Sequence, residues 1–463
     1  MLLKLKREYI FLIPIIILSA ILLYLCIHDG HDWSGDNALY IEQTQAILDG
    51  TIDKLYAISK YSNEHSYRTN SPHLYPMGFP ILLIIPYSFF GMNFIAMKIF
   101  CSLFFLLSIP VIYKLFRPYF SNSFYPFCIV LAIAFHSDFI SFSDVVYSDF
   151  TFLFFSTLTL LCFRRESTIL NQLLLGGLIF FSYYIRDVGI ALLPALFVYQ
   201  WQAKSFAGSE SKKRLQLAIP YLIFAICYVL NSIFLPKGTA NHYDHLVAKL
   251  SWELIGKNID AYIYLFSAYF YTSKLILLLL LIPFFATLFF IWKQQLYLIV
   301  YFVCVLLIYI VWPALQGMRF LFPILPVLVY FMIKGFEQVV ILLKIFQRYL
   351  AVLLIAGLCY MTYLSFERIL DFSKRDTNLS YNSDTKKMYR YISNTIPENE
   401  YIGFSKNRIL RLFTKHNVIL SNLEHFDKSG VDYLLIRKEE IPEGTIVPYR
   451  TVYETQTLIL VHR

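Results

Sequence analysis

Residues 9–26 read YIFLIPIIILSAILLYLC and contain no charged side chain. A run of this length can cross about 30 Å of hydrocarbon as a helix. It follows three basic residues, Lys4, Lys6 and Arg7. The run is too long for the core of a signal peptide, and no small-x-small cleavage site follows it. We therefore predict that it is an uncleaved first membrane span.

The rest of the chain repeats this apolar pattern. Of its 463 residues, 58% are hydrophobic and 15% are charged, whereas a soluble domain carries about 25% charged residues. The formal net charge is +9, but the basic residues gather at the ends of the apolar runs. Membrane topology explains that distribution better than nucleic-acid binding does. The seven cysteines lie inside apolar runs and show no metal-binding or disulfide spacing. The predicted fold class is an all-α polytopic membrane bundle.

The positive-inside rule orients the spans, because short cytoplasmic loops carry an excess of Lys and Arg. With every basic group inside, the N-terminus is cytoplasmic and the C-terminus lies outside the plasma (inner) membrane. These groups are Lys4/Lys6/Arg7, Lys114/Arg117, Arg164/Arg165, Lys204 with Lys212–Arg214, Lys293 and Lys344/Arg348. About eleven spans result, near residues 8–27, 94–116, 121–140, 145–163, 169–185, 188–203, 215–235, 275–292, 295–313, 319–340 and 349–366.

One apolar segment, Met77 to Met97, does not fit this path. Counting it as a span would place the later basic groups on the outer side. It contains Pro80, Pro86 and Gly91 and ends close to the next span. We predict a juxtamembrane helix that lies in, or dips into, the outer interface.

The polar parts of the chain fall on the outer side of this path. Residues 28–76 form a first outer loop, and residues 236–273, with His242, Asp244, His245 and Trp252, are expected to hold a short surface helix. Residues 1–366 would form the membrane domain, and residues 367–463 a small extracytoplasmic α/β domain. In that domain we expect a helix over 383–396, capped by Ser383 or Asp384, and strands at 401–405, 418–421, 431–437 and 457–462.

Three acids lie at the outer ends of predicted spans, where an ionisable residue is a functional candidate. Asp36 stands in Ser34-Gly35-Asp36-Asn37-Ala38-Leu39-Tyr40, just after the first span. It could equally be a helix cap or a solvated acid. Asp149 is expected about one turn inside the fourth span, where capping explains it poorly. Asp144, five residues earlier, could be a cap.

Three basic residues have both a structural and a functional interpretation. Arg186 precedes Asp187 in a predicted tight outer turn. Its structural interpretation is a local ion pair with Asp187. Arg319, at the outer start of the tenth span, could be an interfacial anchor. It could also bind a phosphate, since a guanidinium matches phosphate oxygens bidentately. His73, in Pro72-His73-Leu74-Tyr75-Pro76, could be a phosphate ligand or a surface histidine.

The common position of these residues is more informative than any one of them. In the eleven-span path Asp36, His73, Asp149, Arg186 and Arg319 all lie on the outer face beside the bilayer. A carboxylate acting on a lipid-linked phosphate would need to be there.

The order of these motifs resembles that of the GT-C glycosyltransferases, in particular bacterial relatives of protein O-mannosyltransferases and of the lipid A aminoarabinose transferase (glycosyltransferase families 39 and 83). The similar stretches are Ser34–Tyr40, Tyr75–Pro80 through Phe90-Gly91, Val146–Asp149, Arg319–Pro326 and the tail from Tyr391 to Phe404. Asn37 stands where the family has the Glu of an Asp-Glu pair, so the role of that Glu is not carried over.

The resemblance implies an inverting enzyme that moves a sugar from a polyprenyl-phosphate donor to a lipid, glycan or protein acceptor outside the membrane. Asp36 would be the general base, and Asp149 would orient the acceptor or a basic partner. The donor phosphate would bind the basic residues Arg186, Arg319 and His73. We expect Tyr40, Tyr75 and Asp144 close to the substrate.

The resemblance implies no required cofactor, and it leaves a divalent metal open. Three other interpretations stay open at this point, and one of them is a non-catalytic scaffold in which Asn37 marks lost activity. A transporter or flippase of lipid-linked saccharides would predict inverted repeats and polar groups at the bilayer midplane, and no repeat is evident in the sequence. A polysaccharide ligase or polymerase would also work at the outer face, but residues 236–273 lack the arginines expected of its large outer loop.

Overall fold

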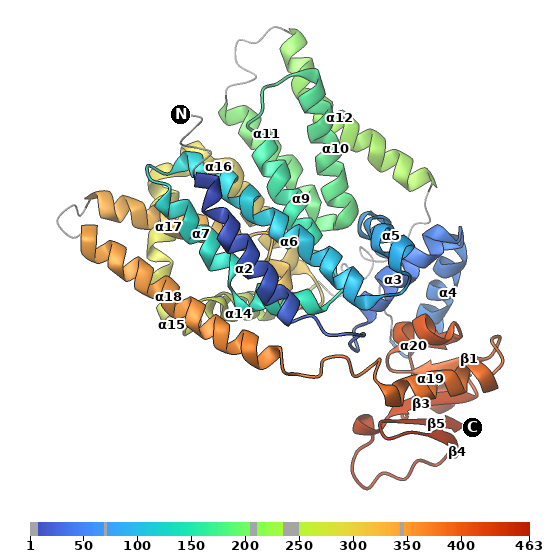
Figure 1. Ribbon diagram of the computed structural model, residues 1–463. Coiled ribbons are helices and arrows are strands. Elements are labelled where there is room, and N and C mark those ends of the chain that lie inside the picture. Colours follow the sequence, from blue (N-terminus) through green and yellow to red (C-terminus); the bar gives the residue numbers. More distant parts are fainter. Residues whose placement is uncertain (1–7, 69–71, 204–210, 235–249, 343–346) are drawn as a thin grey trace.

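The computed structural model describes residues 8–68, 72–203, 211–234, 250–342 and 347–463. Most of these residues form a helical bundle, and a small domain with a β-sheet lies at one end of it (Figure 1). Several residues of the predicted topology lie outside the described part, namely Lys4, Lys6, Arg7, Lys204, Lys344, His242, Asp244 and His245.

Apolar helices of very different lengths build the bundle, as the sequence predicts. They are α2 (Leu12–Leu25), α6 (Phe94–Phe116), α7 (Phe124–Ala134), α8 (Ser137–Ser141), α9 (Asp149–Cys162), α10 (Ile169–Ile185), α11 (Leu192–Gln202), α12 (Ser211–Phe234), α15 (Lys274–Leu280), α16 (Ile282–Val311), α17 (Leu325–Leu342) and α18 (Gln347–Phe372). Every predicted span coincides with one or more of these helices. The chain is therefore a multi-pass membrane protein.

The number of crossings, about eleven, stays a prediction. In the described residues four helices are by themselves long and apolar enough to cross a membrane, and six are if each bent pair counts as one span. The spans predicted at 275–292 and 295–313 share one helix, α16, which is kinked at Gln295. Gln295 is buried and accepts a hydrogen bond from Tyr330 of α17, so a side-chain contact holds the kink.

The Met77–Met97 segment divides into helix α5 (Gly78–Phe90) and the start of α6. With 13 residues, α5 is about 20 Å long, which is too short to cross the hydrocarbon. Its first residue, Gly78, lies against the carbonyl of Tyr184, 2.6 Å from where an added Cβ would stand. The interfacial helix predicted here agrees with this length.

Two helices occupy the first outer loop, α3 (Gly35–Leu48) and α4 (Ile52–His65). In the second outer loop, the described residues form α14 (Trp252–Tyr269), which meets α15 at a bend of 74°. Short 3-10 turns lie between other helices, including η2 (Phe142–Asp144), η3 (Asp187–Ala191) and η4 (Gly317–Leu321). The described residues of both predicted outer loops are thus mostly helical.

The C-terminal domain is an α/β unit, as predicted. Its sheet has the order β2-β1-β3-β5-β4, with β1 parallel to β2 and β3, and β5 antiparallel to β3 and β4. The elements are α19 (Ser383–Thr395), β1 (Tyr401–Phe404), α20 (Asn407–Thr414), β2 (Asn417–Ile419), β3 (Tyr433–Arg437), β4 (Arg450–Glu454) and β5 (Leu458–His462). Side chains of α19, α20 and the sheet share one apolar core.

Three details of this domain differ from the sequence prediction. The cap of α19 is Asn382 rather than Ser383 or Asp384, because the Asn382 side chain accepts hydrogen bonds from two backbone amides of the first turn. Strand β4 was missed because its residues are mostly exposed and show no apolar alternation. Helix α20 was missed too, although Asn407–Thr414 repeats apolar residues at helical spacing.

A buried ionic cluster fastens the tail to the bundle. The Lys98 ammonium group of α6 donates hydrogen bonds to Asp144 at 2.8 Å, to the carbonyl of His28 at 2.7 Å and to Asn378 at 3.3 Å. Asp144 also accepts hydrogen bonds from the His28 amide and from Thr377. The Lys98 and Asp144 side chains are only 1% and 3% exposed. The chain beyond α18 therefore docks through charges that water does not screen.

The first prediction concerns topology. A cysteine at Ser167, in the turn after Arg164 and Arg165, should react only from the cytoplasmic side. A cysteine at Glu443, in the C-terminal domain, should react only from outside. Accessibility to an impermeant thiol reagent in intact cells and inverted vesicles measures this, with the unsubstituted chain as control. Labelling of both positions from one side would contradict the proposed path.

The second prediction concerns the ionic cluster. Lys98→Met leaves the Asp144 carboxylate buried without its cation, and breaking a buried pair in this way typically costs about 3–5 kcal/mol. The double variant Lys98→Met, Asp144→Leu removes both charges and should recover part of that loss. Reversible unfolding of the purified protein measures both variants. Wild-type stability in the single variant would show that the pair does not hold the tail.

Candidate active site

Asp36 lies in the first turn of α3, after the N-cap residue Ser34. A carboxylate at this place is favoured by the positive end of the helix dipole. Asp36 does not cap the helix, and its partners come from distant parts of the chain. Its side chain is 23% exposed, so it can meet a ligand.

Three groups surround the Asp36 carboxylate. Arg319 of η4 donates a hydrogen bond to one oxygen at 2.7 Å, and the Tyr75 hydroxyl donates to the other at 2.5 Å. Arg408 of α20 lies 3.9 Å from the second oxygen and donates to the Tyr75 hydroxyl at 3.2 Å. Two guanidinium groups and a phenol therefore fix the carboxylate in one orientation.

These partners decide the protonation of Asp36. Burial raises the pKa of its carboxyl, but Arg319, the Tyr75 hydroxyl and Arg408 together lower it more, so the pKa lies below the ordinary value. The neighbouring Tyr75 hydroxyl has its pKa raised by burial and by the Asp36 charge. Asp36 is thus a carboxylate at neutral pH, and Tyr75 is a neutral donor.

A second ion pair lies beside the first. Asp149 is the first residue of α9, the helix that coincides with the predicted fourth span, and its Oδ1 is hydrogen-bonded to Arg186. The local pair of Arg186 with Asp187 is therefore not the contact that forms. Burial raises the pKa of Asp187 to about 6, although Arg186 acts to lower it. The turn is tight because Gly189 stands against Tyr183, 2.5 Å from where an added Cβ would lie.

Aromatic rings join the two ion pairs. The guanidinium carbons of Arg186 and Arg319 lie 5.1 Å and 5.8 Å from the centre of the Phe320 ring. Arg319 also lies 4.4 Å from the Tyr147 ring centre. Such stacking holds each cation while leaving guanidinium N–H groups free to meet an anion.

Several buried polar atoms close to Arg186 have no hydrogen-bond partner among the described residues. They are Oδ2 of Asp149 and the hydroxyls of Tyr262 and Tyr309. The Tyr309 ring stacks on Phe320 with centres 4.3 Å apart, and Tyr262 is 2% exposed. Buried polar groups are normally paired, so each exception needs an explanation. A polar ligand between α9, α14 and α16 would supply the missing partners.

The residues predicted close to the substrate divide into two groups. Tyr40 and Tyr75 stack with ring centres 4.7 Å apart, and the Tyr40 hydroxyl bonds Ser148, next to Asp149. Both tyrosines therefore line the site. Asp144 lies in the buried cluster with Lys98, so its place close to the substrate stays a prediction that this geometry does not favour.

Asn37, the departure from the family pattern, has a defined structural role. Its amide donates to Asp32 at 2.8 Å, and its oxygen accepts from the Val146 amide at 2.6 Å. A Glu carboxylate could not donate to Asp32. The pair Asp32 and Asn37 thus connects the first loop to the segment that carries Asp149.

His73, predicted as a phosphate ligand, is 5% exposed and hydrogen-bonded to Asn63 at 2.7 Å. Its ring also packs on Tyr56, with centres 5.5 Å apart. Burial is the largest cause of a lowered pKa for this imidazole, so the neutral form dominates at neutral pH. A buried neutral ring is a poor partner for an anion, and the phosphate assignment of His73 stays a prediction that this geometry does not favour.

Sequence reasoning missed the arginines of α20. Arg411 forms a bidentate pair with Glu42 of α3, with both N···O distances 2.7 Å and both side chains 6% exposed. Arg408, one turn earlier, reaches Asp36. Two arginines three residues apart in an otherwise apolar pattern were the available signal, since they share a helix face.

A divalent metal does not fit the Asp36 carboxylate as it stands, because two guanidinium groups and a phenol surround it. Among the described residues, no three His, Cys, Asp or Glu side chains gather as metal ligands do. We derive no step through a metal.

No protein-family model matches the sequence, and no curated protein matches it. Solved structures do. The crystal structure of ArnT from Cupriavidus metallidurans bound to undecaprenyl phosphate aligns over 97% of both chains, with a TM-score of 0.61 and 11% identity. The oligosaccharyltransferase AglB from Archaeoglobus fulgidus, in complex with an inhibitory peptide and a dolichol-phosphate, aligns over 92% of this chain and 69% of its own, with a TM-score of 0.57 and 9% identity.

Another structure of the same oligosaccharyltransferase, in complex with zinc and sulfate, aligns over 91% of this chain with a TM-score of 0.55 and 11% identity. Identities this low show likeness of fold. ArnT and AglB are both GT-C proteins, and the resemblance that the motifs predicted is confirmed at that level. The chain has the fold of the GT-C membrane glycosyltransferases.

Proposed function

We propose that this chain is an inverting glycosyltransferase that takes a sugar from a polyprenyl-phosphate donor and transfers it on the extracytoplasmic side of the membrane. The observation that carries the proposal is the Asp36 carboxylate, partly exposed and held between Arg319 and Arg408. Its GT-C neighbours with bound undecaprenyl phosphate and dolichol-phosphate support the donor class.

Asp36 would act as the general base. The acceptor hydroxyl attacks the anomeric carbon, Asp36 takes its proton, and the bond from that carbon to the phosphate oxygen breaks with the electron pair going to the phosphate. A base with a low pKa suffices because the hydroxyl proton becomes acidic only as the new bond forms. The phosphate leaves as an anion and needs no general acid.

Arg319 would couple donor binding to the base. Without a donor its guanidinium is engaged by Asp36. A donor phosphate would compete for the same N–H groups of Arg319. If the guanidinium moved toward the phosphate, it would stabilise the Asp36 carboxylate less, and the pKa of Asp36 would rise. Asp36 then becomes a stronger base when the donor is in place. Arg186, held by Asp149, would stabilise the charge that develops on the leaving phosphate.

The unpaired hydroxyls of Tyr262 and Tyr309 support a polar headgroup at this position. A phenol can both donate and accept, as sugar hydroxyls do. The free Oδ2 of Asp149 is a further acceptor. Together these groups would bind the donor sugar, whether hexose or pentose, on the membrane side of Asp36.

The third prediction tests the base. Asp36→Asn keeps the size of the side chain but removes the proton acceptor, so transfer should fall by about 10²–10⁴-fold while donor binding persists. The matched control is Asp49→Asn, at the exposed other end of α3, which should transfer at the wild-type rate. The assay is transfer from polyprenyl-phosphate sugars by the purified protein. Near-wild-type transfer by Asp36→Asn would refute the assignment.

The fourth prediction is a pH effect. Because Arg319, Tyr75 and Arg408 lower the pKa of Asp36, the acid limb of kcat/KM should lie below the ordinary Asp value of about 3.9. Arg408→Gln removes a cation that favours the carboxylate, so the limb should move to higher pH. Arg375→Gln, which removes an exposed arginine paired with Asp371, is the control. If the acid limb of kcat/KM stayed at the same pH in Arg408→Gln, Arg408 would have no effect on the pKa of Asp36.

A further inference from the structure

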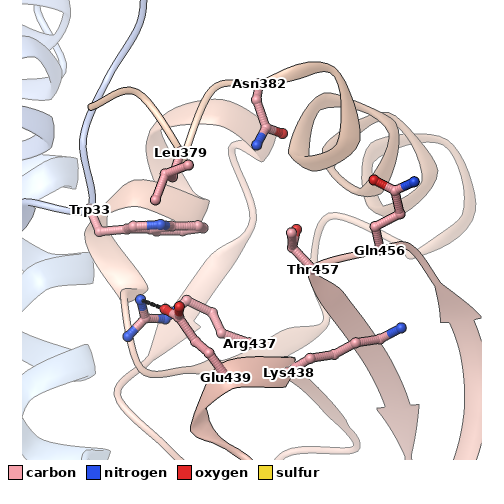
Figure 2. A pocket seen from close by; sticks show the side chains of 8 residues that line it. All are labelled: Trp33, Leu379, Asn382, Arg437, Lys438, Glu439, Gln456 and Thr457. Carbon is pink, nitrogen blue, oxygen red and sulfur yellow. Dashed lines mark hydrogen bonds and ion pairs between the residues drawn. The ribbon is translucent and has the colours of Figure 1, made fainter. Parts of the chain in front are cut away.

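A cavity of about 240 Å³ lies where the loop that carries Trp33 meets the C-terminal domain (Figure 2). It is separate from the membrane-side groups around Arg186. The lining residues are Trp33, Leu379, Asn382, Arg437, Lys438, Glu439, Gln456 and Thr457. One wall thus comes from the loop that carries Asp36, and the others come from the tail.

The Trp33 wall is rigid. The Ser380 hydroxyl donates to the carbonyls of His31 and Asp32, at 2.5 Å and 2.7 Å, and so fixes the backbone just before the ring. The indole packs edge-to-face on Phe404, with ring centres 6.0 Å apart. Figure 2 shows the ring lying between Leu379 on one side and the Arg437–Glu439 pair on the other. The ring is therefore positioned before any ligand arrives.

The charges beside Trp33 are already balanced. Arg437 lies 5.2 Å from the Trp33 ring centre and is paired with both Glu439 and Glu440. Lys438 is paired with Glu454 at 2.5 Å. No described cation of this cavity is left to attract a phosphate. The cavity suits an uncharged polar ligand.

The opposite wall presents hydrogen-bonding groups at fixed places. Asp384 accepts hydrogen bonds from the amides of Gln456 and Thr457, at 3.0 Å and 2.9 Å, which holds the turn before β5. Figure 2 shows Asn382, Gln456 and Thr457 across the opening from Trp33. Among the described residues, the side-chain amide of Gln456 and the Nδ2 of Asn382 have no intramolecular partner, so both can bind a ligand.

We propose that this cavity binds a neutral saccharide unit of a glycan acceptor. The apolar C–H face of a sugar ring suits the electron-rich face of an indole, and its hydroxyls both donate and accept, as the amides opposite do. An acyl chain would leave those amides unsatisfied, at a cost in free energy. An aromatic wall with a few fixed polar groups is the usual composition of a small-molecule site.

The position of the cavity deepens the proposed function, on which this inference rests. Trp33 precedes Asp36 by three residues, a chain length of at most about 11 Å. A sugar held at Trp33 would therefore belong to the same molecule as the hydroxyl at Asp36, as a neighbouring unit. The acceptor would be a glycan that the first loop and the C-terminal domain bind together. The protein would recognise its sugar units and not an attached lipid chain.

The experiment measures binding and not transfer. Neutral trisaccharides (maltotriose, cellotriose and mannotriose) are presented to the full-length protein in nanodiscs free of sugar detergent, and saturation-transfer NMR detects bound sugar. We expect at least one to bind the wild-type protein. Trp33→Leu and Gln456→Ala should each weaken that sugar at least about fivefold, since each removes one ring or amide contact. Trp33→Phe, which keeps a ring, should recover part of the loss.

Two controls separate this inference from the proposed function. Trp201→Leu, which removes an exposed tryptophan at the far end of α11, should bind like the wild type. Asp36→Asn should also bind sugar normally, even though it no longer transfers. Absence of binding by every trisaccharide, or equal binding by wild type, Trp33→Leu and Gln456→Ala, would overturn the saccharide site and leave the role of Asp36 unaffected. Binding lost in Trp201→Leu as well would also overturn it.

Discussion

The region around Asp36 is organised by the need to keep one carboxylate charged where little water reaches it. Asp36 is largely removed from water, and an unpaired charge in such a place is costly. Arg319, 283 residues away in the chain, supplies the closest compensating charge. The start of α3 and the turn before α17 must therefore meet, and the bundle between them has to close in one way.

The C-terminal domain completes this arrangement and is not a separate appendage. Helix α20 lies against α3, where the buried Glu42–Arg411 pair fixes its register. That contact places Arg408 close to Asp36. The ionic cluster of Lys98 and Asp144 holds the beginning of the tail on the opposite side. Two buried ion pairs thus set the position of one guanidinium group, and a shift of the domain would change the charge balance at the base.

The site is incomplete in a way that indicates a ligand. Asp36 is paired with Arg319 and Arg408, and Asp149 is paired with Arg186. Tyr262, Tyr309 and one oxygen of Asp149 lack partners among the described residues. A ligand that carries both an anionic group and hydroxyl groups could bind the arginines and also pair with these unpartnered oxygens. In the proposed mechanism the arginines exchange carboxylate contacts for phosphate contacts, and this exchange links donor binding to the strength of the base. In the same proposal the cavity at Trp33 would bind a neighbouring unit of the acceptor.

The sequence by itself determined the membrane class, the segments that form the apolar helices, the α/β tail, and the candidates Asp36, Asp149, Arg186 and Arg319. These follow from local patterns, because hydropathy, charge and helix signals extend over a few neighbouring residues. The order of the family motifs along the chain predicted the GT-C resemblance, and the fold agrees with that prediction.

Only the tertiary structure decided which charges pair. Arg186 bonds Asp149 and not the adjacent Asp187, and Asp144 joins Lys98 instead of lining the site. Arg408 entered the site without a local signal strong enough to predict it. Partner choice is long-range, since a buried charge accepts whichever opposite charge the packed helices bring within about 4 Å, and no local periodicity encodes that distance.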